Sequence, residues 1–129
     1  MYGFSTRINT SIEEARSRVA EALQDEGFGV LTEIDVAATL KKKLGVDRKP
    51  YLILGACNPT LANQALNADP DIGLLLPCNV VLREEDDGAV TVAFMDPAAV
   101  LGLVNEEGIT ELAGEVRGRL ERVRDALQG

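Results

Sequence analysis

Histidine and tryptophan are absent from this chain of 129 residues, and only two cysteines are present. Without histidine there can be no Ser-His or Cys-His dyad, no histidine general base and no use of a common zinc ligand. The cysteines are not spaced as Cys-x-x-Cys, and two thiols without histidine form a poor zinc set. We therefore expect neither a metal nor a cofactor.

Basic residues are also scarce, with 13 Lys and Arg against 21 Asp and Glu, which gives a net charge of −8. Binding of nucleic acid depends on neutralising phosphates, so this charge and the five aromatic residues argue against a nucleic-acid partner. All four lysines fall in one stretch with Arg48: Lys41, Lys42, Lys43 and Lys49. This local patch could attract a small anion, although a solvated helix end explains it equally simply.

Long apolar runs are missing too, and none approaches the ~20 residues of a membrane helix. The first residues resemble a strand and lack the charged start and apolar segment of a signal peptide. We expect no membrane partner and a cytoplasmic location, where cysteines are more often reduced thiols than disulfides. The length fits a single domain over residues 1–129.

Several helices are predicted from their end signals. Thr10 and Glu13 are spaced as a capping box with Thr10 at the N-cap, and Gly27 is expected to end that helix. Asp35 should cap a short helix closed by Gly45. Two further helices should start at Asn58-Pro59 and Asp96-Pro97, which pair a cap residue with a proline. Apolar residues spaced by 3.6 between 109 and 127 predict a long C-terminal helix lying on a sheet.

Strands are expected at residues 2–8, 28–34, 50–57, 79–83 and 89–95. The segment 50–57 is almost continuously apolar, as a strand covered on both faces would be. The last two should form a hairpin, because Asp87-Gly88 is a turn-forming pair. The predicted fold class is α+β: a single compact domain with a mostly antiparallel sheet of about four to five strands, packed against helices, with a long C-terminal helix.

The two cysteines occur in matching settings, Gly55-Ala56-Cys57-Asn58-Pro59 and Leu75-Leu76-Pro77-Cys78-Asn79. Cys57 should end a strand just before a helix N-terminus, whose dipole favours a thiolate and lowers the thiol pKa. We expect the two sulfurs to lie close together near a pocket that Asn58 also lines. Free cysteine is, however, among the most buried residue types, so packing at strand ends explains both positions without a site.

Three other polar residues complete the candidate ligand-binding set, namely Asn79, Asp35 and Asp96. As a pair of carboxylates, Asp35 and Asp96 could perform acid–base chemistry. Helix capping explains each of them without a functional role.

Four motifs occur in an order that resembles domain-of-unknown-function family 302. They are Gly27-Phe28-x-Val30-x-x-Glu33-Ile34-Asp35, Leu54-Gly55-Ala56-Cys57-Asn58-Pro59-x-x-Ala62, Asp69-Pro70-x-Ile72-Gly73-x-Leu75-Leu76-Pro77-Cys78 and Met95-Asp96-Pro97. The resemblance covers nearly the whole chain and implies a compact bacterial or archaeal α+β domain that forms a homodimer. It puts Cys57, Asn58, Pro59, Pro77, Cys78, Asp35 and Asp96 on motif positions, and it implies no activity, because the family has none assigned.

Two functional hypotheses follow. In the first, the chain is a small cytoplasmic accessory protein whose site near Cys57 and Cys78 binds a small molecule or an anionic ligand, or handles thiol or sulfur chemistry. Cys57 would then be the nucleophile and Cys78 the resolving thiol. In the second, the chain is a non-catalytic homodimeric binding or interaction module in which both cysteines belong to the core. Whether the protein is an enzyme stays open.

Overall fold

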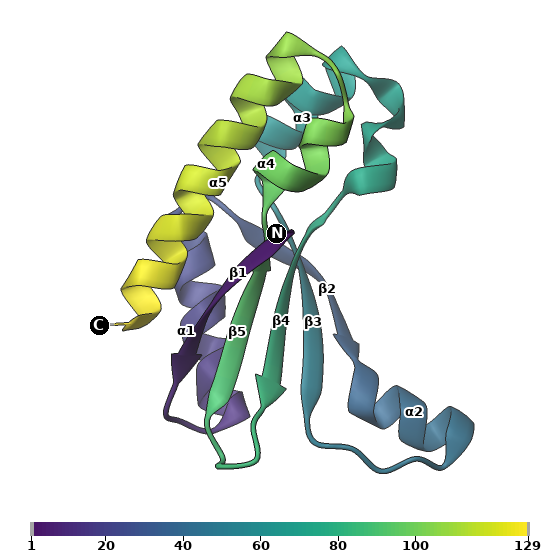
Figure 1. Ribbon diagram of the computed structural model, residues 1–129, viewed down its shortest axis with the longest axis vertical. Helices are drawn as coiled ribbons and strands as arrows, with labels where there is room; N and C mark the ends of the chain where they lie inside the picture. Colours follow the sequence, from purple (N-terminus) through teal and green to yellow (C-terminus); the bar gives the residue numbers. More distant parts are fainter. Residues whose placement is uncertain (1, 129) are drawn as a thin grey trace.

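Five strands form one sheet in the order β1-β5-β4-β3-β2, and every neighbouring pair is antiparallel. The computed structural model describes residues 2–128 (Figure 1). The strands are β1 (Gly3–Ile8), β2 (Gly29–Asp35), β3 (Tyr51–Cys57), β4 (Cys78–Glu84) and β5 (Val90–Met95). The α+β class, the antiparallel sheet and the hairpin predicted from the sequence are therefore confirmed.

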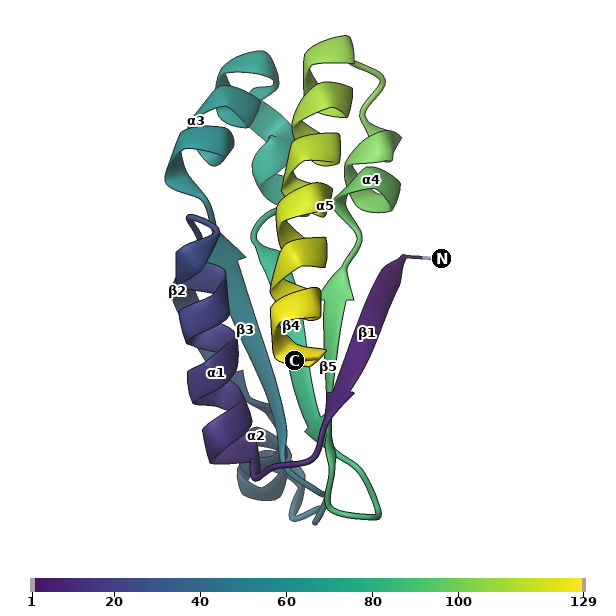
Figure 2. The same cartoon turned by 90° about the vertical axis from the view of Figure 1, so that its left-hand side faces the viewer.

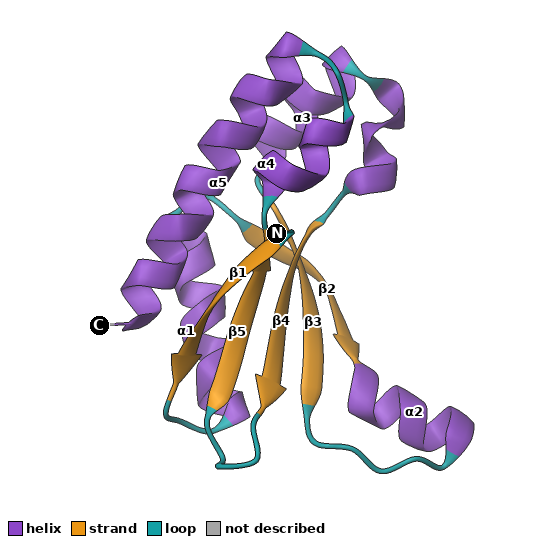
Figure 3. Cartoon of the chain, in the orientation of Figure 1, coloured by secondary structure: helices purple, strands orange, loops and turns teal. Residues whose placement is uncertain are grey.

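The helices lie between and after these strands (Figure 3). They are α1 (Ile12–Asp25), α2 (Val36–Leu44), α3 (Pro59–Ala68), the 3-10 helix η1 (Pro70–Leu75), α4 (Pro97–Val100), the 3-10 helix η2 (Leu101–Leu103) and α5 (Glu107–Gln128). The predicted long C-terminal helix is α5, with 22 residues. Within the described residues, none of these helices is long and apolar enough to cross a membrane.

Three of the predicted N-caps accept a hydrogen bond from the first turn of their helix: Asp35 from the Ala38 amide, Asn58 from the Leu61 amide and Asp96 from the Ala98 amide. The predicted cap at Thr10 is wrong. Ser11 caps α1 instead, and its hydroxyl accepts from the amide of Glu14 at 3.1 Å. The helix begins one residue later than predicted because both residues carry a hydroxyl, and local sequence does not distinguish them.

The helix ends follow the glycine signals. Gly27 adopts φ of 84° just after α1, and the Phe28 amide donates to the carbonyl of Leu23 at 2.9 Å. Gly45 adopts φ of 68° at the end of α2. A residue with a β-carbon is strained in this left-handed region, so glycine lets both helices stop where they do.

One face of the sheet, the inner face, is covered by α1 and α5, which lie side by side in front of it in Figure 2. Alternate residues of β4 and β5 point into this layer and are buried: Cys78, Val80, Leu82, Val90, Val92 and Phe94. From α5 the core receives Val116, Leu120, Val123 and Leu127. The apolar face predicted for the C-terminal helix therefore packs on the sheet.

Beyond one end of the sheet, the remaining helices form a second small core. We call this region the helical cap; it consists of α3, η1, α4, η2 and the first half of α5 (Figure 1). The buried residues of this second core are Ala65, Ile72, Leu101, Ile109 and Ala113. The cap connects the end of β3 to the start of β4 and the end of β5 to α5, so the cysteines lie where the sheet meets it.

The opposite, outer face of the sheet is not covered by any helix of the described chain. Within the described chain, the expected cover of segment 50–57 is therefore present on the inner face and missing on the outer face. Ile53 of β3 points to the outer face and stays only half-buried, whereas Leu54 points to the inner face and is fully buried. An apolar run shows that both sides of a strand avoid water, but it does not show that this chain supplies both covers.

Candidate functional site

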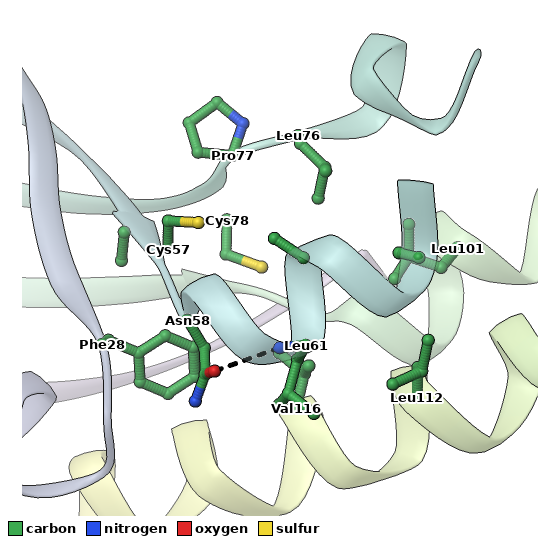
Figure 4. Close-up of a pocket in the computed structure, with 13 residues that line it drawn as sticks. Phe28, Cys57, Asn58, Leu61, Leu76, Pro77, Cys78, Leu101, Leu112 and Val116 are labelled. Carbon is green, nitrogen blue, oxygen red and sulfur yellow. Dashed lines mark hydrogen bonds between the residues drawn. The ribbon is translucent and has the colours of Figure 1, made fainter. Parts of the chain in front are cut away.

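The two cysteines lie next to each other at the boundary between the sheet and the helical cap. Strands β3 and β4 pair so that Ala56 lies directly opposite Cys78, which leaves Cys57 one residue from that position. Figure 4 shows both side chains beside Pro77 and above the start of α3. Both are free thiols, Cys78 buried and Cys57 half-buried.

A small cavity adjoins the thiols, with a volume of about 40 Å³. Its walls are mainly apolar side chains, including Phe28, Leu61, Leu76, Leu101, Leu112 and Val116 (Figure 4). A water molecule occupies about 30 Å³ of liquid, and ligand pockets usually measure about 300–1,000 Å³. The cavity therefore has room for one water molecule and not for an organic ligand.

Both thiol pKa values are raised. Burial raises the pKa of Cys78 to about 11, and the neighbouring Cys57 thiolate adds to this effect. Burial also raises the pKa of Cys57, which is opposite to the direction predicted from its place before a helix. In the first turn of α3, the Asn58 side chain already binds the Leu61 amide and Pro59 has no N–H to offer. Desolvation therefore outweighs the helix dipole, and the thiols stay protonated at neutral pH.

The two candidate carboxylates do not meet each other. Asp35 ends β2, whereas Asp96 follows β5, and two other strands lie between β2 and β5. Asp35 is exposed and caps α2, while Asp96 is only 7% exposed and forms an ion pair with Arg117. They do not form the paired carboxylates that acid–base chemistry would need.

Asn79 does not line the cavity beside the thiols. Its neighbour Cys78 points to the inner face, so Asn79 points to the outer face and is exposed. There it lines a hollow of about 690 Å³ together with Tyr2, Ser5, Val81, Arg83 and Met95. The sequence-based candidates therefore divide among the cysteine cavity, two helix caps and the outer face.

A row of outward-pointing side chains crosses the outer face of the sheet. Strand register aligns one residue from each strand, in the order Ser5, Ala93, Val81, Ile53 and Ile34. We call this the central row. A polar row lies beside it, made of Arg7, Thr91, Arg83 and Tyr51. Sequence analysis missed the central row, although the alternation of Asn79, Val81 and Arg83 with buried residues was a visible signal.

The lysine-rich stretch lies on α2 and the loop after it. No residue of α2 is buried, and the helix extends away from the body of the molecule (Figure 1). Lys41 pairs with Asp47 at 2.8 Å, and Lys49 approaches Asp86 at 3.9 Å. Over residues 2–128, no group of three or more His, Cys, Asp or Glu side chains is arranged to hold a metal ion.

Comparison with known proteins gives a family and no function. The fold is similar to the crystal structure of an uncharacterised conserved DUF302 protein from Bacillus stearothermophilus, with 32% sequence identity, 98% of each chain covered and a TM-score of 0.90. No curated protein matches the sequence. The family model described as a domain of unknown function, DUF302, matches residues 4–127. The chain therefore belongs to the DUF302 family, as its motifs predicted.

Proposed function

We propose that this protein is a non-catalytic interaction module of the cytoplasm that pairs with a second copy of itself through the outer face of the sheet. The observation that carries this proposal is the central row. Four apolar side chains, Ala93, Val81, Ile53 and Ile34, stand in register across four adjacent strands with no helix of the described chain over them.

Hydrophobic burial favours covering this row. Ile34 keeps 49% of its surface exposed, and Ile53, Val81 and Ala93 are each only half-buried. Removing apolar surface from water contributes about 25 cal/mol per Å². In a two-fold dimer the same patch supplies both sides of the interface, so a row that crosses the whole sheet packs on its own copy.

The cysteine region supports the same conclusion. A cavity of about 40 Å³ is too small for a substrate, and both thiol pKa values are raised. A nucleophilic cysteine needs the opposite shift, toward the thiolate. These properties are typical of cysteines that pack as core residues.

Sedimentation at micromolar concentration tests the proposal. Wild type should sediment with twice the chain mass. Val81→Arg, which places a charge in the middle of the central row, should give a folded monomer. Gln24→Arg is the matched control, since Gln24 is an exposed residue of α1 on the other side of the molecule, and it should stay dimeric. A monomeric wild type, or equal behaviour of the two variants, would refute the proposal.

Thiol chemistry is the second candidate, and the adjacency of Cys57 and Cys78 is the observation in its favour. In that case Cys57 should react with iodoacetamide in the native protein below pH 7, and Cys57→Ser should abolish the reaction. If Cys57 and Cys78 are core residues, alkylation should be slow until the protein is denatured. Mass spectrometry of native and denatured samples distinguishes the two functions.

A further inference from the structure

Charge is divided between the two ends of this molecule. Residues 58–79 and 96–116, which build most of the helical cap, contain seven carboxylates and no lysine or arginine. The carboxylates are Asp69, Asp71, Asp96, Glu106, Glu107, Glu111 and Glu115. Residues 36–50, which we call the α2 segment, contain five basic residues and one carboxylate, Asp47. The two segments thus carry opposite charge.

Much of this charge is unmatched within the chain. Among the described residues, no ion pair involves Lys42, Lys43 or Arg48 of the α2 segment. None involves Asp71, Glu106 or Glu111 of the helical cap either, and all three are exposed. By contrast, the acidic hairpin between β4 and β5, which lies near α2, is matched internally. Its Glu85, Asp86 and Asp87 approach Arg83, Lys49 and Arg7.

Exposed apolar side chains accompany the charge at both ends. The α2 segment exposes Leu44 at 69% and Val46 at 45%. The helical cap exposes Leu74 of η1 at 87% and Leu66 at 43%. In Figure 1, α2 and the η1 turn after α3 lie at opposite ends of the molecule, and both extend to the side away from α5. They therefore flank the outer face of the sheet at its two ends.

The sheet alone offers a small interface. Five strands spaced by ~4.8 Å and six residues of ~3.3 Å each give a face of roughly 500 Å². A stable dimer usually buries about 800 Å² on each partner. The α2 segment and the helical cap lie beside the sheet and would enlarge this interface.

We propose that the second copy lies antiparallel on the outer face, so that the α2 segment of each copy docks on the helical cap of the other. This inference rests on the proposed function and names the partner surface. A two-fold axis along the central row reverses the strand direction between the copies. The basic α2 segment of each copy then lies against the acidic helical cap of the other, and the exposed leucines of these two regions meet. An axis along the strands would instead put both α2 segments at one end of the dimer and both helical caps at the other, where like charges repel.

Charge reversal tests the arrangement. We expect Lys41→Glu/Lys42→Glu/Lys43→Glu to raise the dimer Kd at least about tenfold at low salt, because it places like charges against the cap. Asp71→Lys/Glu106→Lys/Glu111→Lys, which reverses the three exposed and unpaired carboxylates of the helical cap, should do the same, and the two triple variants combined should return to near the wild-type Kd. The control, Glu14→Lys/Glu21→Lys/Asp25→Lys on α1, should leave the Kd within about threefold, since these residues are exposed on the helix that covers the inner face, opposite the proposed contact surface.

Failure of this inference can be separated from failure of the proposed function. If Val81→Arg dissociates the dimer but neither triple variant weakens it, or the combination does not restore it, the outer-face dimer stands and the antiparallel docking is refuted. If wild type is monomeric, both are refuted. Zero-length carbodiimide cross-linking of mixed ¹⁴N and ¹⁵N wild-type copies gives an independent readout. Cross-links between labelled and unlabelled chains should join Lys41–Lys43 to cap carboxylates, and a set joining only other surfaces contradicts the docking.

Discussion

The guanidinium of Arg117 donates a hydrogen bond to the carboxylate of Asp96, and this ion pair ties α4 to α5. The other carboxylate oxygen accepts from the Ala98 amide at 2.9 Å and so caps α4. Arg117 also lies over the ring of Phe4, 5.6 Å from its centroid. Asp96, at first a candidate for acid–base chemistry, is therefore fully occupied in joining the end of β5 to both helices.

Loss of this pair should destabilise the fold. Arg117→Met keeps the apolar stem over Phe4 but leaves a buried carboxylate without its ionic partner, so we expect the free energy of unfolding to fall by about 1–3 kcal/mol. Adding Asp96→Asn should recover part of the loss, because asparagine also caps helices and carries no charge. Urea denaturation of wild type, the single variant and the double variant measures these free energies of unfolding. A loss below ~0.5 kcal/mol in the single variant would show that the pair contributes little.

Leu120 of α5 is completely buried on the inner face of the sheet. Leu120→Ala should leave a cavity and lower the free energy of unfolding by about 2–5 kcal/mol. Leu31→Ala is the control, because Leu31 is 67% exposed and its truncation should change stability by no more than ~0.5 kcal/mol. Equal effects of the two substitutions would contradict the core described above.

Gly55 of β3 has no room for a side chain. A β-carbon added there would overlap Oγ1 of Thr32 and lie 2.8 Å from Cγ of Pro77. Gly55→Ala should therefore cost about 1–3 kcal/mol by overpacking. Gly29 on the neighbouring strand has nothing within 4 Å of such an atom, so Gly29→Ala should change stability by only ~0.5 kcal/mol. Thermal unfolding measures the stability of both variants. A Gly55→Ala protein as stable as wild type would disprove the close packing.

The Cys78 thiol should make stability depend on alkaline pH. Its pKa is about 11 in the folded protein and about 8.5 when unfolded. Between these values the folded state binds the proton more tightly, so stability is full below pH ~8.5 and falls as pH rises toward 11. The contribution is at most about 3 kcal/mol. Urea denaturation of wild type and Cys78→Ala at several pH values isolates it, since the variant should lose less stability over this range. If the free energy of unfolding falls equally with pH in both proteins, Cys78 does not titrate in this way.

The sequence by itself determined the elements whose signals are local. Asn58-Pro59 and Asp96-Pro97 each start a helix because the cap and the amide it binds lie within three residues. The spacing of apolar residues predicted α5 and its buried face, because a helix places every third or fourth residue on one side. The N-cap of α1 shows that such signals locate a helix start to within about one residue, because Thr10 and Ser11 are neighbours and each carries a hydroxyl.

Only the tertiary structure decided which segments come together and what surrounds each residue. Ile34, Ile53, Val81 and Ala93 belong to four strands, and strand register alone aligns them in one row. The pKa of Cys57 shows the same dependence. Its neighbours in sequence predict a lowered value, but side chains from β4, α5 and the helical cap bury the region, and desolvation raises it. Capping and periodicity depend on neighbours along the chain, whereas burial and register depend on residues far apart in sequence.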